Sequence, residues 1–426
     1  MPNFSRRTVI KSAAVIGALQ IGSPFAAKTT EAGQVEGAVA GPKSAVSLHV
    51  GWYELHPDVS LNFQLNRWAA YGGPRWVADV RPVIGAVNDY DPWRDTFVML
   101  GERAASEGRM LDAALHFRSA EFFMLPTDPR KEPLRQRLLP MLREAAGVPL
   151  SARREVSFDR LRLPAWLLPA ENARGTLVIF GGFDSYIEEF FPIFTTLRDE
   201  GWNVVAFEGP GQGSVLEEQH APLISDWHRP VAAVLDAFGL NDVTLIGVSL
   251  GGCLAIRAAA FEPRVRRVIA FDVLSDFYAT MMAKQPAWRA RLLTGLLAVG
   301  GGPLVDRIMP TVAQRNPLVE WGVAQARHVF GQERPSEALR AAQAFVTGDV
   351  SHHVRQDVLL LAGAEDHYVP LWQLWEQARS LKAAHSITAR VFTAEEHAQA
   401  HCQVGNLPLA IRVMSSWISS LGNTAS

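Results

Sequence analysis

Cysteine is nearly absent from this sequence. Only Cys253 and Cys402 occur in 426 residues. Two cysteines are too few for a disulfide framework or for the paired motifs of a structural zinc site. We therefore predict two small, mostly buried thiols.

The sequence also lacks a marked excess of charge and the common cofactor motifs. Lys and Arg number 41 against 43 Asp and Glu, a formal net charge of -2, which predicts no basic surface for nucleic acid. No phosphate-binding loop, dinucleotide fingerprint or metal-ligand spacing is present, so we expect neither a cofactor nor a metal. The glycine-rich run at 300–303 follows no predicted strand and lacks the lysine of a phosphate loop, which indicates an ordinary loop.

No apolar run is long enough to cross a bilayer. The N-terminal run from Ser12 to Ile21 falls well short of the ~20 residues that a span requires. It follows the sequence Ser-Arg-Arg-Thr-Val-Ile-Lys at 5–11, which is typical of a twin-arginine export signal. We assign 1–40 to this signal and a linker, with cleavage near Ala26 or after Ala40, and expect a periplasmic or secreted mature protein without a membrane span.

What is present is the composition of a globular protein, with 48% hydrophobic and 20% charged residues. Residues 47–150 show apolar side chains at helical spacing, clearest in the stretches 93–100 and 110–124 on either side of Gly108. This pattern predicts an N-terminal helical segment that contains a helical hairpin.

Residues 151–274 and 351–426 alternate between strand and helix patterns. Expected strands are a hairpin at 154–168 and runs at 176–180, 203–207, 243–247, 265–271, 358–361 and 387–392. Continuously apolar runs are typical of buried parallel strands, and their alternation with helices predicts a doubly wound, mostly parallel sheet of the α/β class. The interval 275–350 has helical patterns without a convincing strand, so we expect a helical cap inserted after the sixth strand.

The motif at 247–251, Gly-Val-Ser-Leu-Gly, lies between a predicted strand and a predicted helix. A sharp strand-to-helix turn with small residues on either side of a serine is the nucleophile elbow of serine hydrolases. We predict Ser249 as the nucleophile. The backbone amides of Leu250, directly after it, and of Phe183, after Gly181-Gly182, are the candidate oxyanion donors.

A serine nucleophile needs a base, and the base needs an orienting acid, in the chain order Ser, Asp or Glu, His. Asp366 follows a buried strand and is the favoured acid, with Glu365 and Asp272 as alternatives. Two histidines follow the last strand. His401, directly before the final helix, is the favoured base, and His397 is the alternative.

With these residues in place, the chain resembles a branch of the α/β hydrolases, that of 2,6-dihydroxypseudooxynicotine hydrolase and the fungal polyketide-shortening hydrolases. The resemblance covers about 90–420 and depends on the helical hairpin and on the motifs at 181–185, 188–189, 208–213, 247–252, 365–367 and 400–406. It implies the α/β-hydrolase fold and favours His401, because the family pattern is histidine, cysteine, glutamine.

The resemblance further implies hydrolysis of a carbon–carbon bond next to a ketone, assisted by an acidic residue after the third strand, where Asp184 stands. Relatives of this branch are often dimers, so a homodimer is an expected state. We predict a serine hydrolase that acts on a mid-sized aromatic or polyketide-like small molecule. An exported carboxylesterase or peptidase is the alternative, and a non-catalytic binding protein on a hydrolase scaffold is the remote one.

Overall fold

The computed structural model describes residues 45–422. The predicted export signal, its cleavage sites and its linker up to residue 44 lie outside the described residues, so export stays a prediction. Among residues 45–422, no helix combines the length and the apolar character that crossing a bilayer requires.

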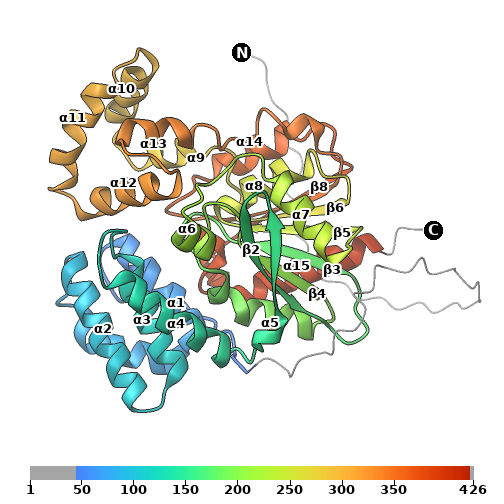
Figure 1. Cartoon of the computed structure of the whole chain (residues 1–426), viewed down its shortest axis with the longest axis horizontal. Helices are drawn as coiled ribbons and strands as arrows, with labels where there is room; N and C mark the ends of the chain where they lie inside the picture. The colour runs from blue at the N-terminus through green and yellow to red at the C-terminus, as the bar shows by residue number, and fades with distance from the viewer. Residues whose placement is uncertain (1–44, 423–426) are drawn as a thin grey trace, which may run out of the picture. The chain divides into compact units, whose positions relative to one another are not determined.

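The centre of the structure is an eight-stranded sheet (Figure 1). Its strands are β1 (Arg153–Phe158), β2 (Leu161–Leu168), β3 (Thr176–Phe180), β4 (Asn203–Phe207), β5 (Val243–Val248), β6 (Val265–Phe271), β7 (Asp357–Gly363) and β8 (Ser386–Phe392), in the order β1-β2-β4-β3-β5-β6-β7-β8. β2 is antiparallel to β1 and to β4, and all other neighbours are parallel. The predicted doubly wound, mostly parallel sheet is confirmed.

The central strands β3, β4 and β5 are buried along their whole length because helices cover both faces of the sheet. Along β3, Val178 packs into one hydrophobic core and Ile179 into the other, as expected for side chains that alternate between two faces. On one side lie α5 (Phe191–Asp199), α15 (Leu407–Gly422) and the N-terminal helices. On the other lie α6 (Gly213–Gln219), α7 (His228–Phe238), α8 (Leu250–Ala259) and α14 (Trp372–Ser380).

The N-terminal segment forms α1 (Val59–Ile84), α2 (Tyr90–Ser106), α3 (Met110–Phe122) and α4 (Lys131–Ala145). The Asp58 carboxylate accepts the Leu61 amide at 2.9 Å and caps α1. Helices α2 and α3 approach closely at Gly101, where a Cβ would lie 2.3 Å from the Phe117 ring. This segment packs onto the same core as α5 and α15.

The cap between β6 and β7 consists of α9 (Phe277–Ala283), α10 (Ala287–Ala298), α11 (Gly302–Ala313), α12 (Pro317–Val329) and α13 (Pro335–Ala342). Its helix α12 reaches the N-terminal segment, since the Trp321 indole donates to the Phe122 carbonyl at 2.8 Å and stacks on the Phe122 ring. Short 3-10 helices η1 (Leu150–Ala152), η2 (Ile187–Phe190), η3 (Ser351–His353), η4 (Ala394–Glu396) and η5 (His401–Gln403) complete the chain.

Candidate active site

Ser249 stands in a strained turn between β5 and α8. Its backbone has φ 61° and ψ -124°, a conformation that non-glycine residues rarely adopt. The turn is so tight that a Cβ at Gly247 would lie 1.8 Å from the Gly251 carbonyl oxygen, and one at Gly252 would lie 2.1 Å from the Asp272 carbonyl oxygen. The glycines are therefore a steric requirement of the turn that presents the serine.

Ser249 and His401 are within hydrogen-bond distance, and so are His401 and Asp366. His401 Nε2 lies 2.8 Å from Ser249 Oγ, and its Nδ1 lies 2.6 Å from Asp366 Oδ2. The other Asp366 oxygen accepts the amides of Tyr368 and Val369 at 2.7 and 3.0 Å, which fixes the carboxylate. With a proton on Nδ1, the imidazole donates to Asp366 and accepts from the serine hydroxyl.

The pKa shifts of His401 and Asp366 are consistent with this arrangement. Burial disfavours the charged form of His401, but Asp366, Cys402 and Asp272 together outweigh it and raise the pKa of the imidazole well above its usual value. Burial likewise acts to raise the pKa of Asp366, yet attraction to His401 and the hydrogen bonds to the carboxylate lower it overall. The pair thus favours a charged imidazole beside a charged carboxylate, which is the state that appears when a serine gives up its proton.

A second carboxyl group, Asp272 at the end of β6, faces the same imidazole. Its Oδ2 lies 3.3 Å from His401 Nδ1 and accepts the Cys402 amide at 3.0 Å, while its Oδ1 accepts the Val273 amide at 2.9 Å. Burial and the neighbouring Asp366 charge raise the pKa of Asp272. The sequence offered Asp272 only as an alternative acid, and gave no sign that both carboxyls reach His401.

Asp272, His401 and Cys402 bring one potential ligand atom each within 4.8 Å of one another. This is not a good metal site. His401 Nδ1 is committed to Asp366, and burial raises the pKa of the Cys402 thiol, which disfavours the thiolate that a metal needs. Cys253 and Cys402 are both free thiols.

The alternative base His397 and the alternative acid Glu365 lie apart from the hydrogen-bonded relay of Ser249, His401 and Asp366. His397 is exposed, caps η4 and has φ 55°. Glu365 is exposed as well, and its amide donates to the Gln399 carbonyl at 2.9 Å. Within residues 45–422, no hydrogen bond or ion pair joins either side chain to Ser249 or His401.

The loop after β3 packs directly against the elbow. A Cβ at Gly182 would lie 2.9 Å from the Leu250 nitrogen and 3.1 Å from Ser249 Cβ, so glycine permits this approach. Leu250 is the first residue of α8, a position whose amide has no acceptor inside its own helix. The Gln212 amide donates to the Gly181 carbonyl at 2.7 Å and holds the loop from the sheet side.

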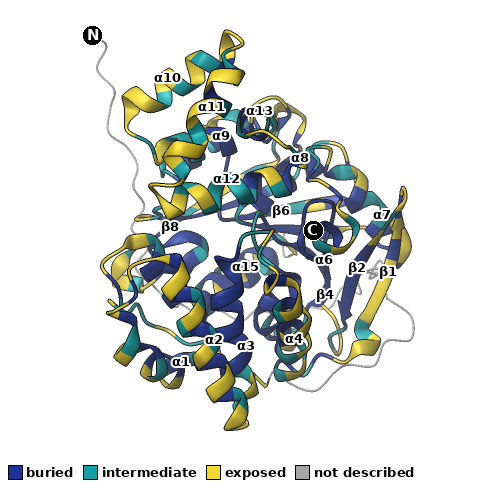
Figure 2. Ribbon diagram, turned by 60° about the vertical axis from the view of Figure 1, so that its left-hand side comes forward, coloured by how far each residue is buried: buried dark blue, intermediate teal, exposed yellow. Residues whose placement is uncertain are grey.

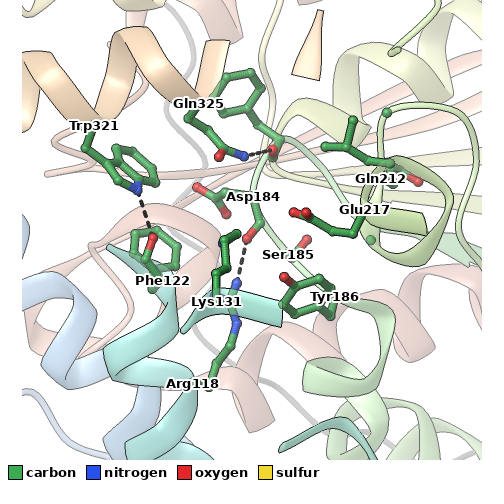
Figure 3. A pocket seen from close by; sticks show the side chains of 14 residues that line it. Arg118, Phe122, Lys131, Asp184, Ser185, Tyr186, Gln212, Glu217, Trp321 and Gln325 are labelled. Atoms are coloured by element: carbon green, nitrogen blue, oxygen red, sulfur yellow. Dashed lines mark hydrogen bonds between the residues drawn. The ribbon is translucent and has the colours of Figure 1, made fainter. Parts of the chain in front are cut away.

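Both helical segments also hold this loop, the cap through Gln325 and the N-terminal segment through Arg118 (Figure 3). Gln325 of the cap donates to the Phe183 carbonyl at 3.2 Å, and Arg118 of α3 donates to the Asp184 carbonyl at 2.6 Å. Arg67 of α1 lies 3.5 Å from the Asp184 carboxylate, which is about one third exposed. Neither Arg118 nor Gln325 carries a sequence motif, so the sequence gave no indication of these contacts.

The two arginines continue into an ion-pair network. It comprises Arg67, Arg118, Glu121, Lys131, Asp184 and Glu189. The Glu189 carboxylate accepts from Arg67 at 2.6 Å and from Arg118 at 2.7 Å. Glu121 pairs with Arg118 and Lys131 and accepts the Tyr186 hydroxyl at 2.8 Å. The network fastens α1, α3 and α4 to the loop after β3.

Aromatic and cationic side chains lie beside the imidazole. The ring of Tyr368 lies 5.3 Å from that of His401, and the ring of Phe63 from α1 lies 6.1 Å from it. The Lys284 ammonium lies 4.8 Å from the centre of the Tyr368 ring, and burial lowers its pKa to about 8. No motif in the sequence marks Tyr368 or Lys284 as a site residue, because their proximity depends on how the cap and α1 pack.

A mostly parallel sheet with a serine elbow after β5, an acid after β7 and a histidine after β8 defines the α/β-hydrolase fold. Residues 175–400 match the family described as alpha/beta hydrolase fold. The chain belongs to this family and is a hydrolase.

Curated relatives include fungal hydrolases. Hydrolase acrC of Aspergillus aculeatus is 29% identical over 311 residues, covering 64% of this chain and 71% of the relative. The 20-hydroxy-prefusarin hydrolase FUS2 of Gibberella moniliformis is 28% identical over 333 residues, covering 68% of this chain and 78% of the relative.

Similar folds among solved structures include 2,6-dihydroxy-pseudo-oxynicotine hydrolase, with a TM-score of 0.56 and 21% identity, covering 83% of this chain and 94% of that one. AbyA5 has a TM-score of 0.61 and 18% identity, covering 86% and 95%. At such identities the likeness shows the fold alone.

Proposed function

We propose that this hydrolase uses Ser249, His401 and Asp366 to cleave a carbon–carbon bond next to a ketone in a mid-sized aromatic or polyketide-like small molecule. The observation that supports the serine mechanism is the unbroken relay of 2.8 and 2.6 Å from Ser249 Oγ through His401 to Asp366. The relay contains a nucleophile, a base and an orienting acid in the order that acyl transfer needs.

In the first step, Ser249 Oγ attacks the ketone carbon while its proton passes to His401 Nε2. The resulting oxyanion is stabilised by the backbone amides of Leu250 and Phe183. One donor of this kind typically lowers the barrier by about 3 kcal/mol. The protonated imidazole is stabilised by Asp366.

In the second step, the bond between the former carbonyl carbon and its α-carbon breaks, and the electron pair leaves with the α-carbon. A second carbonyl on the departing fragment takes this charge as an enolate, which His401 then protonates. Water, activated by the neutral imidazole, hydrolyses the acyl-serine to a carboxylic acid and frees Ser249. An ester follows the same steps with an alkoxide as leaving group.

Two features favour carbon–carbon cleavage over ester cleavage. The Tyr368 ring lies beside His401 and the Lys284 ammonium lies over that ring, so they provide a phenol hydroxyl and a cation to bind the enolate of a departing diketone fragment, whereas an ester leaving group needs neither. The name of the FUS2 relative, 20-hydroxy-prefusarin hydrolase, supports a small-molecule substrate without selecting the bond. Asp184 is proposed to assist, since it directly follows Phe183, whose amide is one of the two proposed oxyanion donors.

Parallel turnover of a β-diketone and a p-nitrophenyl ester tests the proposal. We expect wild type to prefer the diketone, and Ser249→Ala and His401→Ala to abolish both activities. Lys284→Met should reduce diketone turnover while sparing the ester. His397→Asn is the matched control, because asparagine tolerates the positive φ of that position, and it should leave both activities unchanged.

Turnover of the ester alone would assign the chain to the carboxylesterases. Loss of activity in His397→Asn with retention in His401→Ala would overturn the assigned base. Failure of wild type to react with a fluorophosphonate probe at Ser249 would leave only the binding-protein alternative.

A further inference from the structure

Helix α10 in the cap is apolar on two faces. Leu297 is buried and Leu293 is partly buried against the core, as expected for a packed helix. On the opposite side, Trp288, Leu292 and Val299 are exposed, with Val299 82% accessible. At 3.6 residues per turn Trp288 and Leu292 lie about 40° apart, and Val299 is the C-cap of the helix. These three residues are termed the α10 stripe, and their exposure shows that nothing in the described chain covers it.

Helix α11, which follows directly, repeats this arrangement. Val305 is buried, whereas Leu304, Ile308 and Val312 are each between 39% and 49% exposed and recur at a spacing of four residues. Figure 2 shows the exposed residues on both helices. The two stripes together, Trp288, Leu292, Val299, Leu304, Ile308 and Val312, are termed the cap patch. Scattered single apolar residues are normal on a surface, but two consecutive stripes are not.

Arginines flank the cap patch. Arg289 and Arg291 lie on either side of the α10 stripe, about 80° from its centre, Arg307 flanks the α11 stripe, and Arg315 follows its end. Among the described residues, none of the four pairs with a carboxylate. The only acidic residue between 285 and 319 is Asp306, whose carboxylate accepts the Ser336 amide and hydroxyl at 2.8 and 2.9 Å. The patch is therefore locally cationic in a chain of net charge -2.

We propose that the cap patch binds the surface of an anionic phospholipid bilayer. Exposed Trp and Leu side chains flanked by arginines are the pattern of a helix that lies in the lipid interface, with its apolar face among the acyl chains and its cations at the headgroups. The charge of the patch complements anionic headgroups. Such binding would bring the cap, and the site beneath it, to a place where apolar substrates accumulate.

The charges disfavour a second copy of the chain as the occupant. In a two-fold interface the same patch meets itself, which would place arginines against arginines with no free carboxylate between them. A lipid surface has no such conflict. The inference does not depend on which bond the enzyme cleaves.

Vesicle sedimentation with the full chain tests the proposal. We expect binding to phosphatidylcholine vesicles that contain phosphatidylglycerol, and much weaker binding to phosphatidylcholine alone or at high salt. Arg289→Gln, Arg291→Gln, Arg307→Gln and Arg315→Gln combined should lower the partition coefficient by about several hundredfold, since each arginine near such a surface contributes about fivefold. Leu292→Ser with Ile308→Ser should lower it for both compositions.

Trp375→Ala with Arg379→Gln is the matched control, because it removes an exposed tryptophan and an exposed arginine from α14 instead. It should bind as wild type does. Residues 1–44 are common to every variant, so any binding by that stretch cancels in the comparison. If the fourfold variant unfolds, Arg307→Glu alone serves as the second variant.

Equal binding of wild type and the arginine variants would overturn the proposal. So would the absence of binding to anionic vesicles. Sedimentation equilibrium tests for a second copy of the chain as the occupant of the patch. If wild type forms a dimer that Leu292→Ser with Ile308→Ser dissociates, and does not bind vesicles, the patch is assigned to a second copy and the lipid proposal is overturned.

Discussion

Two clusters of charged groups, the ion-pair network and the groups around His401, differ in their balance of cations and carboxylates. The ion-pair network contains three cations, Arg67, Arg118 and Lys131, and three carboxylates, Glu121, Asp184 and Glu189. The cluster around His401 contains two carboxyls, Asp366 and Asp272, for one imidazole.

This difference separates a structural cluster from one that can move a proton. Burial acts to raise the pKa of Glu121, but Lys131 and Arg118 lower it overall, so the carboxylate stays charged and holds its partners in place. In the other cluster the two carboxyl pKa values are driven apart, with that of Asp366 lowered and that of Asp272 raised. Titratable groups with divergent pKa values are the pattern of acid–base sites.

The largest expected effect comes from Asp366→Asn. Removing the carboxylate that orients Nδ1 should lower kcat by about 10⁴-fold, because the imidazole then favours the wrong tautomer. Steady-state kinetics on the better substrate measure this. Glu365→Gln, one residue away and exposed, should leave kcat unchanged. A loss of less than tenfold in Asp366→Asn would mean that Asp272, 3.3 Å from Nδ1, already serves as the acid.

The next largest effect is expected on the stability of the protein, in the ion-pair network with its three cations and three carboxylates. Arg118→Met leaves Glu121 and Glu189 buried with fewer cations, and we expect it to cost about 3–5 kcal/mol in the free energy of unfolding. Urea denaturation measures the change. Arg130→Met is the control, since its partners Asp95 and Asp128 form half-exposed pairs with it that are worth about 1 kcal/mol or less. Equal costs for the two variants would contradict the comparison.

The fold was accessible from the sequence because the buried strands are continuous apolar runs. The runs at 176–180 and 203–207 coincide with β3 and β4, and the cap and N-terminal helices lack such runs. Ser249 could be named because its turn demands glycines at fixed offsets, and Asp366 and His401 because chain order limits the choice.

Contacts between segments could not be predicted in this way. Arg118 reaches the Asp184 carbonyl from 66 residues away, and nothing in its local sequence separates it from the exposed arginines of the same segment. Asp272 was visible as a carboxylate after a strand, but its distance to His401 depends on how the ends of β6 and β7 and the loop after β8 converge. Motifs in the sequence identify such groups as candidates, whereas only the structure gives the distances between them.

A smaller effect is expected in the cluster around His401, where two carboxyls face one imidazole. Asp272→Asn keeps the hydrogen-bond acceptor but removes a charge that, when present, stabilises the protonated imidazole. We expect the pKa of His401 to fall, so that the acidic limb of the kcat/KM profile moves about one pH unit lower. The profile of wild type against Asp272→Asn measures this. An unchanged acidic limb would show that Asp272 stays neutral and acts only through its contacts with Val273 and Cys402.

The smallest effect concerns Glu188 and Glu189, two consecutive buried glutamates of which, within residues 45–422, only Glu189 has ion-pair partners. Glu189 accepts from two arginines, whereas one oxygen of the buried Glu188 has no hydrogen-bond partner among the described residues. Burial, together with the charge of Glu208, raises the pKa of Glu188 to about 8. Its folded form therefore keeps a proton that the unfolded chain loses near its ordinary value of 4.5.

Stability should accordingly fall as pH rises from about 4.5 to about 8, because the folded state binds the extra proton in that window. Glu188→Gln has no proton to lose, so we expect it to match wild type near the acidic end and to be more stable by about 1 kcal/mol at the alkaline end, where Glu208 shares the effect. Thermal unfolding across this range should show a rise in Tm of about 2–4 °C in the variant at the alkaline end. Glu189→Gln should instead destabilise the protein throughout, because it strips two arginines of their shared carboxylate. If stability changed with pH in the same way in Glu188→Gln and Glu189→Gln, the ion-pair network would not distinguish the two glutamates.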